Sequence, residues 1–362
     1  MAIIIFFMRT AVIVSPNWKD YASKYLEACL SSLREQKEVD QFKIFLVDNG
    51  SSAQSRQLLQ ETAERILGQS IPFELLSSPD NLGFAGGNNL ALRQAANQGY
   101  LYAALFNMDG RLDPLALHYL EKSLDQDGAL GAVQARIMLW PDKHLVNSLG
   151  NVTHFLGFGY CLGYRQSYEQ ASELGAIAYA SGAAVMLRLS ALARVGLFDE
   201  EFWMYNEDQD LSWRLWLSGF SIKVEPRSVF YHEYEFSRSV SKYYWMDRNR
   251  LLVIFKNYHW ATLLIIMPAL LGVELMTPLI AWRGGWLKQK IKVWGYFLRP
   301  GTWRYLALAR RQSQALRRVS DSSIVKMFSP IIDYQEVSGL ATRMGNRFLT
   351  VYWQIVRKLI FW

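Results

Sequence analysis

The sequence lacks the cysteines of a disulfide framework. Its 362 residues contain only two, Cys29 and Cys161. These thiols could pair, but so low a count favours a reducing compartment over the disulfide-rich scaffolds of small secreted proteins. Internal repeats and low-complexity tracts are also missing, and 51% of the residues are hydrophobic. This composition excludes a disordered chain and can fill a large core.

A secretory signal is missing as well. The opening MAIIIFFM is apolar over too short a run and has no basic leader. We expect it to extend the first strand, or to precede a start at Met8. The length of the chain predicts one large domain with an appendage, or two domains.

Charge is divided unevenly along the chain. Residues 241–362 hold 19 Lys and Arg against 5 Asp and Glu, a net of +14, whereas residues 1–240 carry a net of −7. Eight of the 13 tryptophans also lie in the basic part. We therefore predict a first domain at 1–240 and a helical, basic, Trp-rich region with a different role at 241–362.

Short apolar runs alternate with helical patterns in the front half. Brief β-branched and aromatic runs predict buried strands, and apolar residues spaced near 3.6 predict helices. This alternation is typical of an α/β fold with a mostly parallel sheet and helices on both faces. The predicted strands are TAVIVS, FKIFLVD, PFELLSS and YLYAALF, and the predicted helices are YASKYLEACLSSLREQ, SRQLLQETAERIL and NNLALRQAANQG.

The pattern becomes mixed between about 128 and 235. GAVQARIML, AIAYASGAAVMLR and FSIKVEPRSVFYH predict strands around a helix that carries EDQDLSWRLWLSG. Gly219 stands where that helix should end. After about residue 241 no strand pattern remains, and we expect helices only.

Polar side chains lie where predicted parallel strands end, the edge at which such sheets bind ligands. Asp48 closes the second strand and could accept hydrogen bonds from a nucleobase or ribose; the alternative is an Asx-turn. NMDG closes the fourth strand. Asp109 there suits Mg²⁺ or Mn²⁺ on a diphosphate, with Asn107 assisting, and the alternative is an ordinary turn.

A glycine-rich stretch, Asn81 to Leu92, leads into the third helix. Gly83, Gly86 and Gly87 would let the backbone approach a ligand, and the helix offers N–H groups and its dipole to an anion. The spacing is not that of a dinucleotide-binding fingerprint. A tight strand-to-helix turn is the alternative.

Three acids crowd the start of the EDQD helix. Asn206 is the predicted N-cap, followed by Glu207, Asp208 and Asp210. Helix capping could explain one or two acids, and the helix dipole would keep a carboxylate ionised, as a general base must be. Asp210 points to another side of the helix and should have a structural or orienting role.

One histidine follows a predicted strand in VFYHEYE. A lone histidine such as His232 is more often structural than a ligand. It becomes a candidate Mn²⁺ ligand only if the fold brings it to Asp109.

The order of these motifs resembles that of the inverting family 2 glycosyltransferases with the GT-A fold, and most closely their rhamnosyltransferase-like branch. VDNGSS, NLGFAGGNN, NMDG, NEDQDL and His232 follow one another as in that family, and YYWMDRNRLLVIFKNY resembles the stretch after the branch's catalytic domain. The resemblance covers about residues 9–258. It departs from the family at Asn107, where many GT-A enzymes have the first Asp of an Asp-x-Asp motif.

The resemblance implies a role for each motif. Asp48 would contact the nucleoside of the donor, Asp109 and His232 would hold Mn²⁺ or Mg²⁺, Asp208 would be the catalytic base, and Glu207 would assist substrate binding. The other donor-binding residues would be Asn81, Gly83, Phe84, Asn88 and Asn107.

The same resemblance implies the substrates. The donor would be a nucleotide-diphosphate sugar, with deoxythymidine diphosphate (dTDP) rhamnose favoured and a UDP sugar possible. The acceptor would be a hydroxyl of a lipid-linked glycan in cell-surface polysaccharide synthesis. One base suffices for inversion, because the cation replaces the acid that glycosidases use. The alternative, which the Asn107 departure permits, is a non-catalytic membrane-bound module that binds sugar nucleotide or glycan.

The basic region contains a long apolar stretch. Residues 261–282 are about enough to span a bilayer, but they include Glu274 and two prolines. Both flanks are basic, which opposes a single span under the positive-inside tendency. We therefore expect a helical hairpin or an interfacial segment at the cytoplasmic face of the cell membrane.

The end of the chain supports an interfacial arrangement. Its cations should face anionic lipid, whereas the alternative is a helix packed on the catalytic domain or on a second subunit. The apolar content fits lipid better than nucleic acid, so we expect no nucleic-acid partner. The apolar stripe comprises Phe348, Tyr352, Ile355, Leu359 and Trp362, and the polar stripe comprises Arg347, Gln354 and Lys358.

Overall fold

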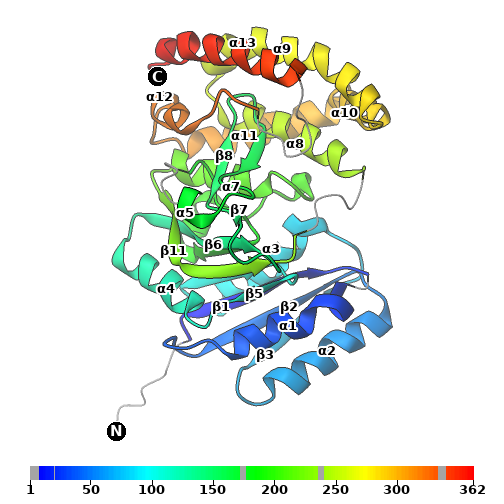
Figure 1. Ribbon diagram of the computed structural model, residues 1–362, viewed down its shortest axis with the longest axis vertical. Helices are drawn as coiled ribbons and strands as arrows, with labels where there is room; N and C mark the ends of the chain where they lie inside the picture. Colours follow the sequence, from blue (N-terminus) through cyan, green and yellow to red (C-terminus); the bar gives the residue numbers. More distant parts are fainter. Residues whose placement is uncertain (1–7, 20, 172–176, 235–239, 333–339) are drawn as a thin grey trace.

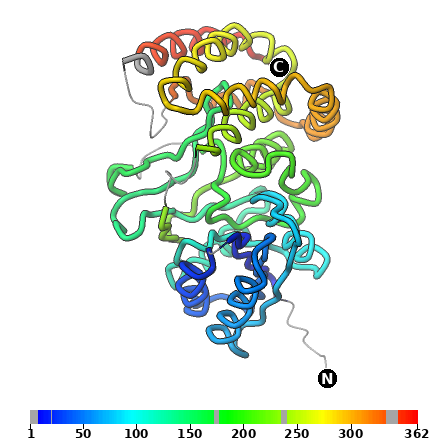
Figure 2. The backbone as a smooth tube through the Cα atoms, turned by 90° about the vertical axis from the view of Figure 1, so that its right-hand side faces the viewer, coloured from blue at the N-terminus to red at the C-terminus, as the bar shows by residue number. Residues whose placement is uncertain are grey.

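The computed structural model in Figure 1 describes residues 8–19, 21–171, 177–234, 240–332 and 340–362. Residues 1–7, which we expected to extend the first strand, lie outside this part of the chain. The sheet and its helices form one half of the molecule, and the helices after residue 241 lie above them in Figure 1. Figure 2 shows the same two layers from the side.

The first four strands form the parallel half of a nine-stranded sheet. β1 pairs in parallel with both β2 and β4, and β2 pairs in parallel with β3. Helices connect these strands, as the alternating pattern predicts. The bounds are β1 Thr10–Asn17, α1 Tyr21–Arg34, β2 Phe42–Asn49, α2 Ala53–Leu67, β3 Phe73–Ser78, α3 Gly83–Asn97 and β4 Tyr102–Phe106.

The second half of the sheet is mixed. Its strand order is β3-β2-β1-β4-β10-β6-β11-β5, with β7 paired to β6. β10 runs antiparallel to both β4 and β6, whereas β11 is parallel to β6. The bounds are β5 Gly110–Leu112, α4 Ala116–Gln126, β6 Leu130–Leu139, β7 Val146–Ser148, β8 Asn151–Thr153, β9 Gly159–Cys161, α5 Tyr168–Ala171, β10 Ala184–Arg188, α6 Leu189–Val195, η1 Glu200–Phe202, α7 Glu207–Leu217 and β11 Ser221–His232.

Helices cover both faces of the sheet, as predicted. Alternate residues of a strand point to opposite faces, so Val12 and Val14 belong to the hydrophobic cluster that includes residues of α1, α2 and α4. Ala11 and Ile13 belong to the cluster on the other face, which includes residues of α3, α6 and α7. The short β-branched run TAVIVS is therefore buried on both sides, which is why it carries no polar alternation.

Two element boundaries differ from the sequence prediction. α3 begins at Gly83 and not at Asn88, so the glycine-rich stretch forms the first turns of the helix. β10 begins at Ala184, later than the predicted strand, because three preceding amides bond side chains in place of a neighbouring strand. Ala180 donates to Ser212 Oγ, and Ser181 donates to Gln134 Oε1.

All regular elements in 240–332 and 340–362 are helical, as expected. One hydrophobic core joins these helices to residues before the predicted boundary at 240, including Phe155, Phe202 and Trp213. The boundary itself stays a prediction. The elements are α8 Lys242–Asn257, α9 Trp260–Arg283, α10 Leu287–Phe297, α11 Pro300–Ala315, α12 Asp321–Ile324, η3 Val325–Met327, α13 Leu340–Val356 and η4 Arg357–Leu359.

A buried ion pair fastens α7 to α8. Asp210 Oδ2 accepts hydrogen bonds from Arg214 Nε at 2.8 Å and from Lys256 Nζ at 2.9 Å, and Asp210 Oδ1 accepts one from Asn257 at 2.9 Å. Burial alone would raise the pKa of Asp210, but the attraction of Lys256 and Arg214 outweighs it and lowers this pKa to about 2. Asp210 is therefore structural, in agreement with its predicted side of the helix.

We expect Asp210→Asn to lower the free energy of unfolding at pH 7 by about 3–5 kcal/mol, because buried Arg214 loses its carboxylate partner and buried Lys256 keeps only Asp199. Urea unfolding measures this. The loss should shrink as the pH falls from about 4 to about 2, since the lowered pKa stabilises the fold only where the unfolded carboxylate is ionised. Asp142→Asn, at an exposed position, is the matched control. Equal stability of both variants would contradict the assignment.

Candidate active site

Three distant motifs meet at the segment Ser181–Ala183. The Gly182 N–H donates to Asp208 Oδ2 at 3.1 Å, and the Asn107 N–H donates to the Ala183 carbonyl at 2.8 Å. A Cβ built on Gly182 would lie 3.1 Å from ring carbons of Phe84, so the ring lies directly over this glycine. The NMDG turn, the glycine-rich stretch and the EDQD helix thus surround three residues of chain.

His232 reaches Asp109, which was the condition for considering it a metal ligand. β11 pairs with β5 so that His232 lies opposite Gly110. The ring Nε2 lies 3.0 Å from Asp109 Oδ1. The other carboxylate oxygen accepts a hydrogen bond from the hydroxyl of Tyr21, on α1.

The groups around Asp109 fit a divalent cation. His232 Nδ1 lies 2.9 Å from Asn147 Oδ1, and its Nε2 lies 3.0 Å from Asp109 Oδ1, so the ring is held from both sides with one nitrogen facing the carboxylate. A buried amide oxygen, Asn107 Oδ1, has no hydrogen-bond partner among the described residues. One carboxylate, one imidazole and one amide oxygen suit Mn²⁺ or Mg²⁺ whose other ligands come from a diphosphate and water. Among the described residues, no group of three or more His, Cys, Asp or Glu side chains is arranged so that it could hold a metal ion by itself.

The two acids at the start of α7 are held in poorly solvated positions. Burial raises the pKa of Asp208 to about 6, although the N–H groups of Gly182 and Gln209 favour its charged form. Burial, together with the Asp208 charge, raises the pKa of Glu207 well above its usual value. Glu207 Oε2 is buried without a hydrogen-bond partner in the described chain. Loss of solvation therefore outweighs the interactions that favour the charged forms, and the expectation that the helix dipole keeps a carboxylate ionised stays a prediction.

Asn206 occupies the N-cap position of α7, as predicted, but it does not cap with its side chain. Its backbone is left-handed, with φ 65°, and its side-chain amide donates to Gln209 Oε1 at 2.6 Å. A capping side chain needs an extended N-cap backbone, which this residue does not have.

The glycines of the donor stretch have packing roles. Gly83 has φ +70°, and a Cβ there would lie 2.3 Å from the Trp203 carbonyl oxygen. A Cβ on Gly87 would lie 2.4 Å from Pro16 Cγ. Direct approach of a ligand to these glycines, which we expected, stays a prediction.

Asparagines hold this stretch in place. Asn81 Oδ1 accepts hydrogen bonds from Gly83 N at 2.9 Å and from Asn49 Nδ2 at 3.0 Å. Asn88 Nδ2 donates to the Phe84 carbonyl at 2.9 Å, which leaves the buried Asn88 Oδ1 without a partner among the described residues. This amide oxygen is available to a ligand.

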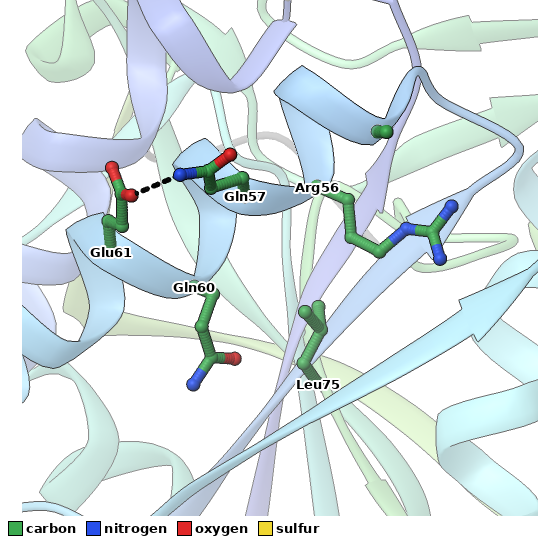
Figure 3. A pocket seen from close by; sticks show the side chains of 6 residues that line it. Arg56, Gln57, Gln60, Glu61 and Leu75 are labelled. Carbon is green, nitrogen blue, oxygen red and sulfur yellow. Dashed lines mark hydrogen bonds between the residues drawn. The ribbon is translucent and has the colours of Figure 1, made fainter.

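Asp48 makes the turn that was the alternative to ligand binding. Its Oδ1 accepts hydrogen bonds from the backbone and hydroxyl of Ser51. Its Oδ2 pairs with Arg56 Nε at 3.0 Å. Arg56 also lines a hollow of about 490 Å³ between α2 and β3, seen in Figure 3. That hollow lies at the edge strand and not where the three motifs meet; its lining residues are Ala53, Arg56, Gln57, Gln60, Glu61 and Leu75.

Sequence reasoning missed several residues around the site. Trp203 donates from Nε1 to the Asn81 carbonyl at 3.4 Å and stacks on Trp245 of α8, with ring centroids 4.7 Å apart. Gly182 and Asn147 were missed as well. A glycine next to a serine carries no signal of its own, and only the fold brings Asn147 to His232.

Comparison with known proteins identifies the family. The model of the family described as glycosyl transferase family 2 matches residues 12–196. The chain belongs to this family. That stretch includes Asp48, Asp109 and Gly182, but ends before Asp208 and His232.

One curated relative is the poly-beta-1,6-N-acetyl-D-glucosamine synthase of Staphylococcus aureus (strain MSSA476). It is 26% identical over 220 residues, which cover 61% of this chain and 48% of that protein. The chain therefore spans about half the length of the relatives it matches. This match does not assign the chain to the rhamnosyltransferase-like branch of the family.

Solved structures share the GT-A fold with family 2. S. aureus TarS 1–349 in complex with UDP has a TM-score of 0.50 at 18% identity, covering 85% of this chain and 89% of that one. The mannosyltransferase PcManGT from Pyrobaculum calidifontis, solved with GDP-Man and Mn²⁺, has a TM-score of 0.51 at 15% identity, covering 98% and 87%. These likenesses establish the fold alone.

We expect the free energy of unfolding of Asp208→Asn, relative to that of the native protein, to increase by on the order of 1 kcal/mol between pH 4 and pH 8, because the variant carries no poorly solvated charge beside Glu207. A raised pKa means that the native fold loses stability as the pH rises through about 6. The variant also loses one acceptor oxygen for the N–H groups of Gly182 and Gln209, a cost that does not depend on pH. Thermal unfolding of both proteins from pH 4 to pH 8 measures the difference, and a difference that does not change with pH would contradict the burial argument.

Proposed function

We propose that the chain is an inverting, metal-dependent transferase that moves a sugar from a nucleotide-diphosphate donor to a hydroxyl. One observation carries the proposal: consecutive residues, Gly182 and Ala183, bond Asp208 and Asn107. This places a carboxylate whose pKa is about 6 beside the NMDG turn that contains Asp109. A base and a diphosphate-binding site are the two parts that such a transfer needs.

Asp208 is the proposed base. At pH 7 it is mostly ionised, and its pKa lies close enough to neutrality to accept a proton from an attacking hydroxyl. The hydroxyl oxygen attacks the anomeric carbon, the bond to the donor phosphate breaks, and Asp208 takes the hydroxyl proton. The Gly182 N–H keeps the accepting oxygen aimed into the site.

In the proposal Glu207 is protonated, whereas Asp208 is ionised. The raised pKa of Glu207 favours the protonated carboxyl group, the form that can donate a hydrogen bond to a sugar oxygen. Two adjacent acids thus supply one acceptor and one donor. This agrees with the assisting role that the family resemblance implies.

A divalent cation, when bound, neutralises the charge that develops on the leaving nucleoside diphosphate. Asp109 and His232 would hold it, with Asn107 Oδ1 as a further oxygen. Asp48 would contact the nucleoside, and the stretch containing Asn81, Gly83, Phe84 and Asn88 would line the donor pocket. The Mn²⁺ in the PcManGT complex supports this choice of metal.

The substrates of this chain are part of the proposal. The motif resemblance favours dTDP-rhamnose, whereas the UDP of TarS and the N-acetylglucosamine polymer named for the curated relative favour a UDP sugar. The name of that relative also supports a role in cell-surface polysaccharide synthesis. We propose a lipid-linked glycan as the acceptor.

The acceptor proposal is supported by the exposed apolar residues of the outer helices. One described helix, α9, is long and apolar enough to cross a membrane. Its Leu275 is 80% exposed, and Phe348 and Ile355 of α13 are 65% and 61% exposed. α9 and α13 lie side by side, farthest from β3 (Figure 1). Phe348, Ile355 and Leu359 of the predicted stripe therefore face outward, whereas Tyr352 and Trp362 pack on the core. We propose that both helices lie on an anionic membrane surface at the cytoplasmic face.

An interfacial position agrees better with Glu274 than a span does. This mid-helix carboxylate pairs with Arg250 of α8 and with Lys290 Nζ of α10, the latter at 2.6 Å. A spanning α9 would have to break these bonds and carry the charge into hydrocarbon, which is costly.

A non-catalytic sugar-nucleotide binding module is the second candidate, because Asn107 replaces the first Asp of the usual metal motif. Release of nucleoside diphosphate separates the two. With Mn²⁺, an acceptor glycolipid, and dTDP-rhamnose or UDP-N-acetylglucosamine, we expect release from the native protein. Binding of a donor without any release or transfer would favour the module.

We expect Asp208→Asn to lower transfer by about 10²–10⁴-fold, the usual contribution of a general base. Asp109→Asn should instead raise the Mn²⁺ concentration needed for half-maximal release. Asp142→Asn, the same chemical change at an exposed position, should leave both unchanged. Near-normal transfer by folded Asp208→Asn would refute the assignment of the base.

We expect the pair Phe348→Glu and Ile355→Glu to lower binding to phosphatidylglycerol vesicles by about tenfold or more, because two exposed apolar side chains can no longer enter the interface. Flotation of the full chain measures this. Leu101→Glu, at a position 52% exposed beside the sheet, is the matched control. Equal flotation of all three proteins would count against membrane binding by these helices.

A further inference from the structure

The loop before the catalytic helix has an unusual backbone. Trp203, Tyr205 and Asn206 have φ values of 60°, 66° and 65°. Side chains other than glycine rarely adopt this left-handed region, and such residues persist only where their surroundings hold them. Three of them within four positions, directly before Glu207, require a strong external restraint.

One buried amide group supplies that restraint. Asn249 of α8 is fully buried, and its Nδ2 donates to three carbonyl oxygens of the loop and its approach. The distances are 2.9 Å to Phe202, 2.9 Å to Met204 and 2.7 Å to Tyr205. Without this donor, three carbonyls of the left-handed loop would lose their common partner.

Arg248 orients the amide. Its Nε donates to Asn249 Oδ1 at 2.9 Å, which leaves the Nδ2 side facing the loop. Its guanidinium also donates to the Glu201 carbonyl and lies 4.6 Å from the ring centroid of Trp245. Trp245 in turn stacks on Trp203. Neighbouring residues of α8 thus hold the loop from Glu201 to Tyr205.

We propose that Arg248 and Asn249 form a positioning clamp that sets the direction from which α7 presents Asp208. The clamp acts on the loop, and the loop carries the first bond of α7, from Asp210 N to the Asn206 carbonyl at 2.9 Å. The kinetic part of this inference rests on the proposed transferase function. It assigns a catalytic duty to a helix that lies within the basic C-terminal region.

The test compares Asn249→Ala with Asn249→Asp in the full chain. Both remove the N–H donor, but the aspartate keeps the shape of the side chain. We expect kcat to fall about 10²-fold in both, with little change in donor KM, because a displaced base costs rate and not binding. Hydrogen exchange of the amides at 203–208 should rise, while exchange in β1 and β4 stays unchanged.

Asn346→Ala is the matched control, because Asn346 also bonds a loop backbone, at Ile332, far along the chain. Activity within threefold of the native protein for both Asn249 variants would overturn the proposal. So would a loss of kcat without faster exchange at 203–208. If neither variant folds, Arg248→Lys decides: it keeps the charge but loses the Nε donor, and should lower kcat about tenfold.

The exchange measurement also separates this inference from the transferase proposal. A native protein that transfers no sugar with any donor would refute the function, yet faster exchange at 203–208 in the variants would still support the clamp. Transfer by the native protein together with unchanged exchange in the variants would refute the clamp alone.

Discussion

The candidate site depends on backbone N–H groups just before β10 that bond side chains and not a neighbouring strand. These are the N–H groups of Ala180, Ser181 and Gly182. A buried N–H without a partner costs about 1–3 kcal/mol, so this segment is stable only when α7 supplies Ser212 and Asp208 to it. Packing of α7 and assembly of the site are therefore one event, and a Cβ at Gly182 would come within 3.1 Å of the Phe84 ring, so the ring would have to shift by a few tenths of an ångström to admit a side chain.

The pKa values of two acids on α7 shift in opposite directions. Asp210 faces Arg214 and Lys256, and the pKa of its carboxyl falls to about 2. Asp208, two residues earlier, accepts hydrogen bonds from the N–H groups of Gly182 and Gln209, and burial raises its pKa to about 6. Paired charges hold the helix on α8, while Asp208 keeps the raised pKa that the proposed base requires. An environment that separates the pKa values of neighbouring acids is how proteins assign their roles.

Helices and strands were predicted correctly from the sequence where their buried residues recur with the period of a helix or a strand. The strand TAVIVS and the helix ending at Gly219 are of this kind. The N-cap position of Asn206 was predicted, but its left-handed backbone was not. Prediction failed where side chains replaced backbone partners: β10 starts late because Gln134, Ser212 and Asp208 accept hydrogen bonds from the residues before it. Such bonds join residues far apart in sequence, and no local pattern encodes them.

The site residues divide in the same way. Asp109 and Asp208 lie at the ends of elements and carry chemistry that their positions reveal. His232 could be considered only if the fold delivered it, and the β11–β5 pairing does so. Asn147, Gly182, Arg248 and Asn249 act through neighbours, so their residue types alone gave no indication.

Buried ion pairs hold the helices of the basic C-terminal region together beneath their exposed apolar surface. Within this region, Arg250 and Lys290 are fully buried and neutralised by Asp247 and Glu274, which fastens α9 and α10 to α8. A buried pair of this kind adds little net stability but fixes one arrangement strongly, since breaking it leaves a bare charge. Helices α9 and α10 are thus joined to α8, whose Asn249 donates to carbonyl groups of the loop before Asp208. Helix α8 therefore contacts both the outer apolar helices and the loop that precedes α7, so one helix joins the two parts of the proposed function.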